Sequence, residues 1–231
     1  MFSLLRLSSR RAWQTLNLSR QKLVGAFYVM LGLAPITSLA LSLIGLVPLY
    51  KSALWGIIPL LAIGGITAFV HPRMGRLAGI GLLIGIFAVL LYDCTRIPFI
   101  LGNVWGDFIP QIAAHLLPGN GPNLVIGYLW RYLGNGGGMG LAFVVGYGLT
   151  RPKINRWGLG VGYGLLIWGC LLATLGLMPP DADSLFRVTP LTLTLSFLGH
   201  VVYGLGLALG IWYSPGALSE IAPSDVRQKS L

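Results

Sequence analysis

Long apolar stretches alternate with short polar segments along almost the whole chain. The apolar stretches cover residues 24–49, 53–70, 77–92, 128–149, 159–178 and 191–212. Most of them approach the ~20 residues that an α-helix needs to cross about 30 Å of hydrocarbon. The pattern therefore predicts an all-α integral membrane protein, a polytopic bundle of about six transmembrane helices.

The basic residues mark one side of this bundle. With the N-terminus in the cytoplasm, the inner segments hold twelve of the sixteen Lys and Arg: Arg6, Arg10, Arg11, Arg20, Lys22, Arg73, Arg76, Arg151, Lys153, Arg156, Arg227 and Lys229. The outer segments hold Lys51, Arg96 and Arg187, and Arg131 lies at the outer end of the fourth helix. Cytoplasmic loops of membrane proteins carry an excess of Lys and Arg. The charge pattern therefore predicts that both termini face the cytoplasm.

The composition excludes an ordinary soluble domain. Hydrophobic residues make up 55% of the chain and charged residues only 10%, whereas charged residues average about 25% in soluble domains. The formal net charge is +10, but the cations lie at cytoplasmic helix ends, where anionic lipid headgroups attract them. The expected partner is the lipid bilayer and not nucleic acid. Cys94 and Cys170 lack the spacing of a disulfide framework or a metal knuckle, and we expect both to be small buried residues.

Three segments are expected along the chain. Residues 1–22 contain five cations and no acid, which predicts a cytoplasmic or interfacial N-terminal segment on the inner leaflet. Residues 23–213 form the transmembrane domain, and residues 214–231 form a cytoplasmic tail. The acid-free N-terminus, rich in Arg and Ser, also fits an organelle transit peptide. The expected location is a prokaryotic cytoplasmic membrane or a thylakoid-type membrane, with an organelle membrane as the alternative.

The longest connection, residues 93–122, lies on the outer face in this topology. Pro98 is expected to end the third helix. Residues 105–117 then place apolar side chains at helical spacing, and a Pro-Gly-Asn-Gly-Pro sequence follows. We expect a short amphipathic helix that lies flat on the outer surface or dips into the bundle. Long connections are often functional, so this segment is a candidate cap over a site.

Glycine contributes 33 of the 231 residues, about twice its usual share. Many glycines stand four residues apart, as Gly81 and Gly85 or Gly136 and Gly140 do, a spacing that lets membrane helices approach closely. The stretch 135–140 includes three consecutive glycines. It indicates either very close packing or a break in the fourth helix, and a break would present backbone carbonyls to a ligand or ion.

His200 is the one ionisable residue that the predicted spans place near the middle of the bilayer. Such residues are costly in lipid and are candidates for function. A neutral histidine could ligate a metal, haem iron or chlorophyll magnesium, or relay protons, with Tyr203 on the same helix face. It could equally bond a neighbouring side chain and only support packing. The sequence identifies no cofactor and no metal.

Asp93, Arg96 and Arg131 form a second group of candidates, at the outer ends of helices three and four. Asp93 and Arg96 stand three residues apart and could pair on one helix face. Alternatively, Asp93 could face inward and pair with Arg131, which stands between Trp130 and Tyr132. Arg131 could instead extend to the lipid headgroups or bind an anionic group.

These groups suggest one polar pocket that opens outward. It would lie between helices three, four and six, under the 105–117 segment. Its candidate ligand or cofactor residues are Asp93, Arg96, Asp107, His115, Arg131, Asn135, His200 and Tyr203. Few carboxylates lie on this side, which argues against a divalent-metal site. The sequence contains no hydrolase motif, so no catalytic residue is assigned.

Three functions follow, in order of preference. The first is a non-catalytic bundle that binds an apolar or amphipathic ligand, or serves as an accessory subunit beside partner membrane subunits. The second is a small-solute transporter or permease, which a break in the fourth helix would favour. The third is an intramembrane lipid-modifying enzyme that uses His200, or Asp93 with His115, as acid and base.

Overall fold

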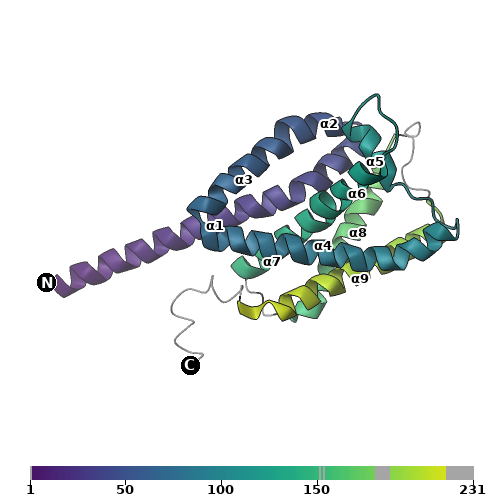
Figure 1. Ribbon diagram of the computed structural model, residues 1–231. Helices are drawn as coiled ribbons and strands as arrows, with labels where there is room; N and C mark the ends of the chain where they lie inside the picture. The colour runs from purple at the N-terminus through teal and green to yellow at the C-terminus, as the bar shows by residue number, and fades with distance from the viewer. Residues whose placement is uncertain (1, 151, 153, 180–187, 217–231) are drawn as a thin grey trace.

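The computed structural model describes residues 2–150, 152, 154–179 and 188–216, and for residues 2–18 the backbone alone. The described part consists of helices and their connections, without β-strands (Figure 1). In chain order the elements are α1 (Phe2–Leu43), α2 (Leu49–Ser52), η1 (Ala53–Ile57), α3 (Ile58–Val70), α4 (Pro72–Leu101), α5 (Ile109–Leu116), α6 (Leu124–Leu129), η2 (Trp130–Gly137), α7 (Gly138–Thr150), α8 (Arg156–Leu177) and α9 (Pro190–Tyr213). The predicted all-α helical bundle is confirmed.

Within the described residues, five helical stretches are long and apolar enough to cross a membrane: Ser19–Leu43, Leu49–Val70, Pro72–Leu101, Arg156–Leu177 and Pro190–Tyr213. The remaining predicted span falls on α6, η2 and α7, a helical run that the π-helix η2 divides into short elements. The chain is thus a membrane protein, while the sixth crossing and the sidedness of the termini stay predictions. Several cations of the predicted topology lie outside the described residues: Arg151, Lys153, Arg187, Arg227 and Lys229.

Local polar signals explain where several helices begin. Asn123 and Asn155 each accept a hydrogen bond from a backbone N–H of the following turn, at 3.1 and 3.2 Å, as helix N-caps do. Thr189 and Thr192 form a reciprocal capping box at the start of α9. Pro72 lies in the first turn of α4, where its missing N–H is not needed. The length of the apolar stretch that follows each of these starts then determines how far the helix extends.

Pro98 lies inside α4 and does not end it. The helix continues to Leu101, and the backbone N–H of Gly102 bonds the carbonyl of Pro98 at 3.0 Å. Membrane helices tolerate an internal proline when neighbouring groups satisfy the freed backbone groups. The expectation that Pro98 ends the helix was therefore wrong. As a consequence, Asp93 and Arg96 lie in a helix interior and not at the edge of a loop.

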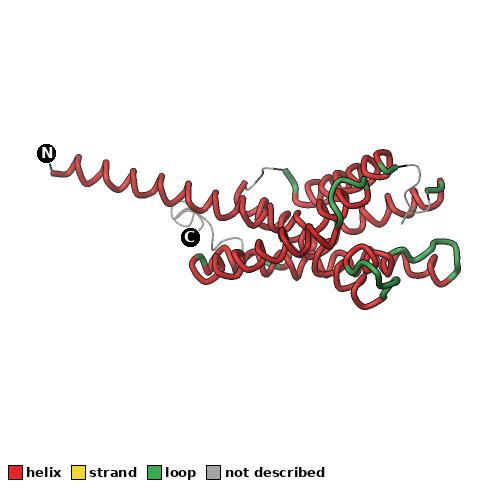
Figure 2. Tube along the Cα trace, turned by 90° about the horizontal axis from the view of Figure 1, so that it is seen from above, coloured by secondary structure: helices red, strands yellow, loops and turns green. Residues whose placement is uncertain are grey.

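Helix α4 forms the centre of the bundle and packs against α3, α7 and α9, while α1 packs on α7 and α8 on α9. Figure 2 shows the elongated bundle from above, with the N-terminal part of α1 extending beyond the other helices. The helices approach most closely where glycines meet. A Cβ on Gly140 would lie 2.5 Å from the backbone nitrogen of Gly85, and one on Gly206 would lie 2.9 Å from Cα of Ala88. Small residues thus determine the spacing of the helices, as in other membrane bundles.

The run of three glycines at the junction of η2 and α7 is closely packed and unbroken. A Cβ on Gly136 would lie 2.5 Å from Cγ1 of Val89. The carbonyl oxygens of Gly136 and Met139 accept hydrogen bonds from the hydroxyls of Tyr203, at 2.8 Å, and Tyr163, at 3.0 Å. Of the two interpretations, close packing is observed. A break in this helix would have favoured transport. The structure instead has the π-helix η2, which continues directly into α7.

Cys94 and Cys170 are both exposed on the surface of the chain. The expectation that they are buried was wrong, because Cys94 lies on an exposed part of α4 and Cys170 on an exposed part of α8. A thiol is only weakly polar, so such a position costs little in a lipid environment.

Candidate functional site

An apolar cavity of about 420 Å³ lies between α1 and α8, and we refer to it as the α1–α8 cavity. Its long walls include Ile36, Leu39, Leu43, Ile167, Leu171 and Leu175. Helix α5 contributes to one side, and η2 with parts of α4 and α9 forms what we call the floor. The volume lies within the ~300–1,000 Å³ that is usual for small-molecule sites. The cavity is therefore large enough for an extended ligand.

Helix α5 covers the cavity with its apolar face. Ile109 and Ile112 are each only 1% exposed, and they pack with Leu39 of α1 and Leu49 of α2 in one buried cluster. The helix lies within the 105–117 segment that the sequence marks as a candidate cap. Its apolar packing holds this cap against the ends of α1 and α2.

The floor carries most of the polar lining residues of the cavity: Tyr92, Arg131, Asn135, His200 and Tyr203. The walls add Thr37, Tyr163 and Thr174, of which Tyr163 and Thr174 donate their hydroxyls to backbone carbonyls. Nδ1 of His200 lies 2.7 Å from the carbonyl oxygen of Ser196. The imidazole meets the ring of Tyr92 edge-on, with the two ring centroids 5.2 Å apart. Within the part of the chain that the structure describes, the side-chain oxygen of Asn135 has no hydrogen-bond partner, although the residue is only 8% exposed. An apolar cavity with a few convergent polar groups is the usual form of a ligand site.

Asp93 lies at the centre of a buried charge network beside this floor, and it is 1% exposed. Nε of Arg131 donates to both carboxylate oxygens, at 3.0 and 2.9 Å, and Nη2 donates to Oδ1 as well. Tyr132 donates its hydroxyl to Oδ2 at 2.9 Å, and Nε of Arg96 lies 3.5 Å from Oδ1. The two pairings that the sequence left open, with Arg96 and with Arg131, therefore occur together.

Arg96 extends the network to α5 and α6. Its Nη2 donates to Oδ1 of Asp107 and to the hydroxyl of Tyr128, each at 3.0 Å. Tyr128 in turn donates to Oδ2 of Asp107 at 3.0 Å, and the backbone N–H of Ile109 donates to Oδ1 at 3.2 Å. The guanidinium carbon lies 5.3 Å from the ring centroid of Phe108. These contacts fasten the beginning of α5 to the bundle.

The four charges of this network cancel. Two carboxylates face two guanidiniums, through the ion pairs of Asp93 with Arg96 and Arg131 and of Asp107 with Arg96. A charge is costly at membrane depth unless it is paired. Each charge depends on its neighbours, because removing one partner of a buried pair leaves the other uncompensated. The network thus supports the floor and presents no surplus charge to the cavity.

The structure brings most of the predicted site residues together in two adjoining groups. The charge network contains Asp93, Arg96, Asp107 and Arg131, and the cavity floor contains Arg131, Asn135, His200 and Tyr203. His115 of α5 is half-buried and lies in neither group. It shares no hydrogen bond or ion pair with Asp93, so the acid–base pair considered for an enzyme is not formed in the described structure.

Sequence reasoning missed the walls of the site. It placed the pocket between helices three, four and six, whereas α1 and α8 bound most of the cavity. Hydropathy alone does not tell which faces of two apolar helices meet. It also missed that the hydroxyls of Tyr128 and Tyr132 bind the carboxylates. Their spacing of four residues, on one helix face at the predicted depth of Asp93, is the signal that could have revealed them.

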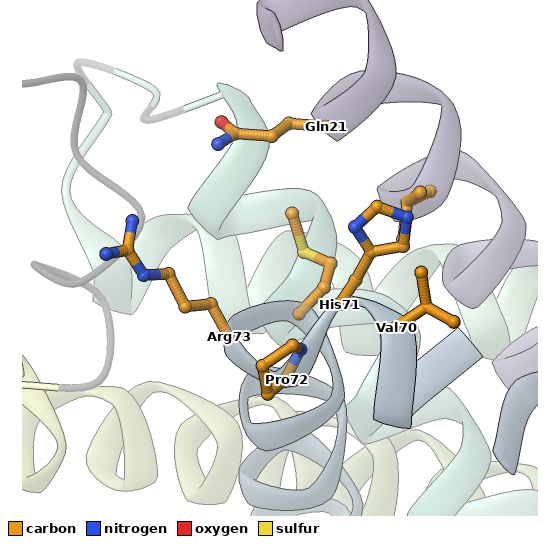
Figure 3. A pocket seen from close by; sticks show the side chains of 7 residues that line it. Gln21, Val70, His71, Pro72 and Arg73 are labelled. Atoms are coloured by element: carbon orange, nitrogen blue, oxygen red, sulfur yellow. The ribbon is translucent and has the colours of Figure 1, made fainter. Parts of the chain in front are cut away.

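A second cavity, of about 200 Å³, lies at the turn between α3 and α4. Gln21, His71 and Arg73 are its polar lining residues. Figure 3 shows the side chains of His71 and Arg73 extending to different sides of Pro72. Because these groups do not converge on one point, the α1–α8 cavity is the stronger candidate site.

The described residues contain no group of three or more His, Cys, Asp and Glu that could hold a metal ion. Protein metal sites commonly use three or four such ligands. The use of His200 as a cofactor ligand therefore stays a hypothesis without support from neighbouring ligands in the described structure.

Asp107→Asn is expected to loosen α5. The change removes the charge-assisted hydrogen bond from Arg96, and such bonds contribute about 1.5–3 kcal/mol. Amide hydrogen exchange in residues 109–116, followed by mass spectrometry in detergent, should then accelerate about tenfold or more. Exchange in α8 of the same protein is the internal control. Unchanged exchange in α5 would show that Asp107 does not hold the cap.

Searches against protein-family models, curated proteins and solved structures found no match to this chain.

Proposed function

We propose that this integral membrane protein binds one elongated amphipathic molecule in the α1–α8 cavity and does not catalyse its conversion. The observation that carries the proposal is the combination of long apolar walls with a polar floor in one cavity of about 420 Å³. The apolar part of the ligand lies along α1 and α8. Its polar end lies against Arg131, Asn135 and His200.

The position of the cavity supports access from the membrane. Leu166 lines the cavity although it is 62% exposed, and Cys170 is both a lining residue and exposed. The cavity wall on α8 therefore reaches the outer surface of the chain. A molecule dissolved in the bilayer could enter sideways, without passing through water.

The bonding of Asp93 favours a supporting role over a catalytic one. Asp93 accepts hydrogen bonds from Arg131 and Tyr132. A general acid or base must be free to exchange a proton with the substrate. Asp93 is occupied by structural contacts, so we assign it a supporting role.

A second function, as an accessory subunit of a membrane complex, is favoured by the sparse packing of two spans. Only 11% of the most apolar part is buried in Leu49–Val70, and the same share in Arg156–Leu177, and Trp55 in the first of them is 78% exposed. These spans could contact lipid or a partner subunit. Light scattering of protein extracted with mild detergent distinguishes lipid contact from subunit contact. A monomer without partner subunits would argue against the accessory-subunit function.

Filling the cavity is expected to expel the ligand. Cys170→Trp places an indole among the lining residues of α8, whereas Gly169→Trp places it at a neighbouring position with open space around it. Protein purified in mild detergent is extracted with organic solvent, and its lipids are quantified by mass spectrometry. We expect about one enriched molecule per chain in the wild type and a loss of about tenfold or more in Cys170→Trp.

The Gly169→Trp variant is the matched control and should retain the wild-type amount. Equal lipid content in all three proteins, with the same composition as the surrounding membrane, would show that the cavity holds no specific ligand.

A further inference from the structure

We infer that the polar end of the bound molecule is an uncharged hydrogen-bond donor, a hydroxyl group on a long apolar body as in a long-chain alcohol, a sterol or a quinol. The inference rests on the proposed function and specifies the chemical class of its ligand. It follows from the kind of polar atoms that the floor leaves available.

Selectivity in this cavity comes mainly from the floor, where most of its polar lining residues lie. Lipid tails are as apolar as the leucine and isoleucine side chains of the walls, so transfer of a hydrocarbon chain from bilayer to cavity gains little. A polar group at membrane depth, by contrast, is strongly disfavoured until it is hydrogen-bonded. The floor therefore decides which membrane molecule is retained.

Asn135 offers the first acceptor. Its side-chain oxygen has no hydrogen-bond partner in the described structure, the residue is 8% exposed, and it lines the cavity. Buried acceptors are almost always paired, and an orphaned one calls for an explanation. This oxygen has almost no exposed surface, so the amide group has to rotate toward the cavity before the hydroxyl of a bound ligand can satisfy it.

His200 offers the second acceptor. A carbonyl oxygen can only accept, so Nδ1 must donate its hydrogen to Ser196 across the 2.7 Å contact. The neutral imidazole then carries its lone pair on Nε2. Tyr203, on the same helix, bonds the carbonyl of Gly136, the residue that follows Asn135. This bond joins α9 to η2 beside both acceptors and places them on the same floor.

Arg131 does not make the floor an anion site. Its Nε and Nη2 are both occupied by Asp93, and the two groups cancel in charge. A carboxylate or phosphate head would bring an uncompensated charge into an apolar cavity, which is costly. The floor therefore matches a neutral donor better than an acid.

The test uses three probes of equal chain length that differ only at one end: hexadecanol, hexadecanoic acid and hexadecane. Delipidated wild-type protein in mild detergent is incubated with an equimolar mixture, passed over a size-exclusion column, and analysed by gas chromatography. We expect hexadecanol to be retained about tenfold over hexadecane and to exceed the acid. In Asn135→Leu, which keeps the side-chain size but removes the acceptor, the preference for hexadecanol over hexadecane should fall several-fold.

Each other outcome has a distinct meaning. Equal retention of all three probes would overturn the inferred head group while leaving cavity binding intact. Preferred retention of the acid would overturn it in favour of an anion contact at Arg131. Retention of none, in wild type and Cys170→Trp alike, would overturn the proposed function itself. Because the wild-type comparison needs no variant, the test remains decisive even if Asn135→Leu does not fold.

Discussion

Asp93→Asn is expected to cost about 3–5 kcal/mol of folding free energy, the range for breaking a buried ion pair. Asp93 is 1% exposed and holds Arg131 through both carboxylate oxygens. Its neutralisation leaves buried Arg131 without a counter-ion. The same change also removes one of the two carboxylates that pair with Arg96. Unfolding of the purified protein in mixed micelles of mild detergent and dodecyl sulfate, followed by tryptophan fluorescence, measures the loss.

A double-variant cycle tests the reason for this loss. Arg131→Gln in the Asp93→Asn background removes the stranded charge, so the double variant should be more stable than the sum of the single variants predicts. A loss below about 1 kcal/mol for Asp93→Asn, which is the range of exposed ion pairs, would show that the network is not a buried support of the floor.

Gly140→Ala is expected to destabilise the bundle by about 1–3 kcal/mol or more, as overpacking of a close contact does. The added Cβ would lie 2.5 Å from the backbone nitrogen of Gly85, and a backbone atom cannot turn aside as a side chain can. The contact between α4 and α7 would have to open. The same unfolding assay measures the effect.

Gly146→Ala on the same helix is the matched control. Nothing lies within 4 Å of its added Cβ, and alanine is the better helix former by about 1 kcal/mol. We expect this variant to be as stable as the wild type or more stable. Equal destabilisation by both substitutions would indicate that glycine matters for helix flexibility and not for the approach of α4 to α7.

Much of the fold could be predicted from the sequence, because apolar length and charge act locally. Five of the predicted spans match helices that can cross a membrane, since about 20 apolar residues have few other stable arrangements. The glycine spacing also indicated close packing correctly. The course of α4 past Pro98 could not be predicted, because it depends on contacts made after the chain folds.

The candidate site was predicted in its polar part and missed in its apolar part. Ionisable residues within or at the ends of the apolar stretches are few, so His200 inside a stretch and Asp93 and Arg131 at two outer ends stood out from their positions along the chain. The α1–α8 cavity depends on two helix faces that make little contact with each other. Their leucines and isoleucines are indistinguishable in sequence from those that face lipid, so no pattern could have marked them.

The central claim is that the α1–α8 cavity holds one specific amphipathic molecule, and native mass spectrometry of the intact protein tests it most directly. Wild type and Gly169→Trp, released from detergent micelles, should each carry a single adduct of discrete mass, and Cys170→Trp should appear as the bare chain. Bare chains for all three proteins, or the same ladder of bulk lipids on all three, would contradict the claim.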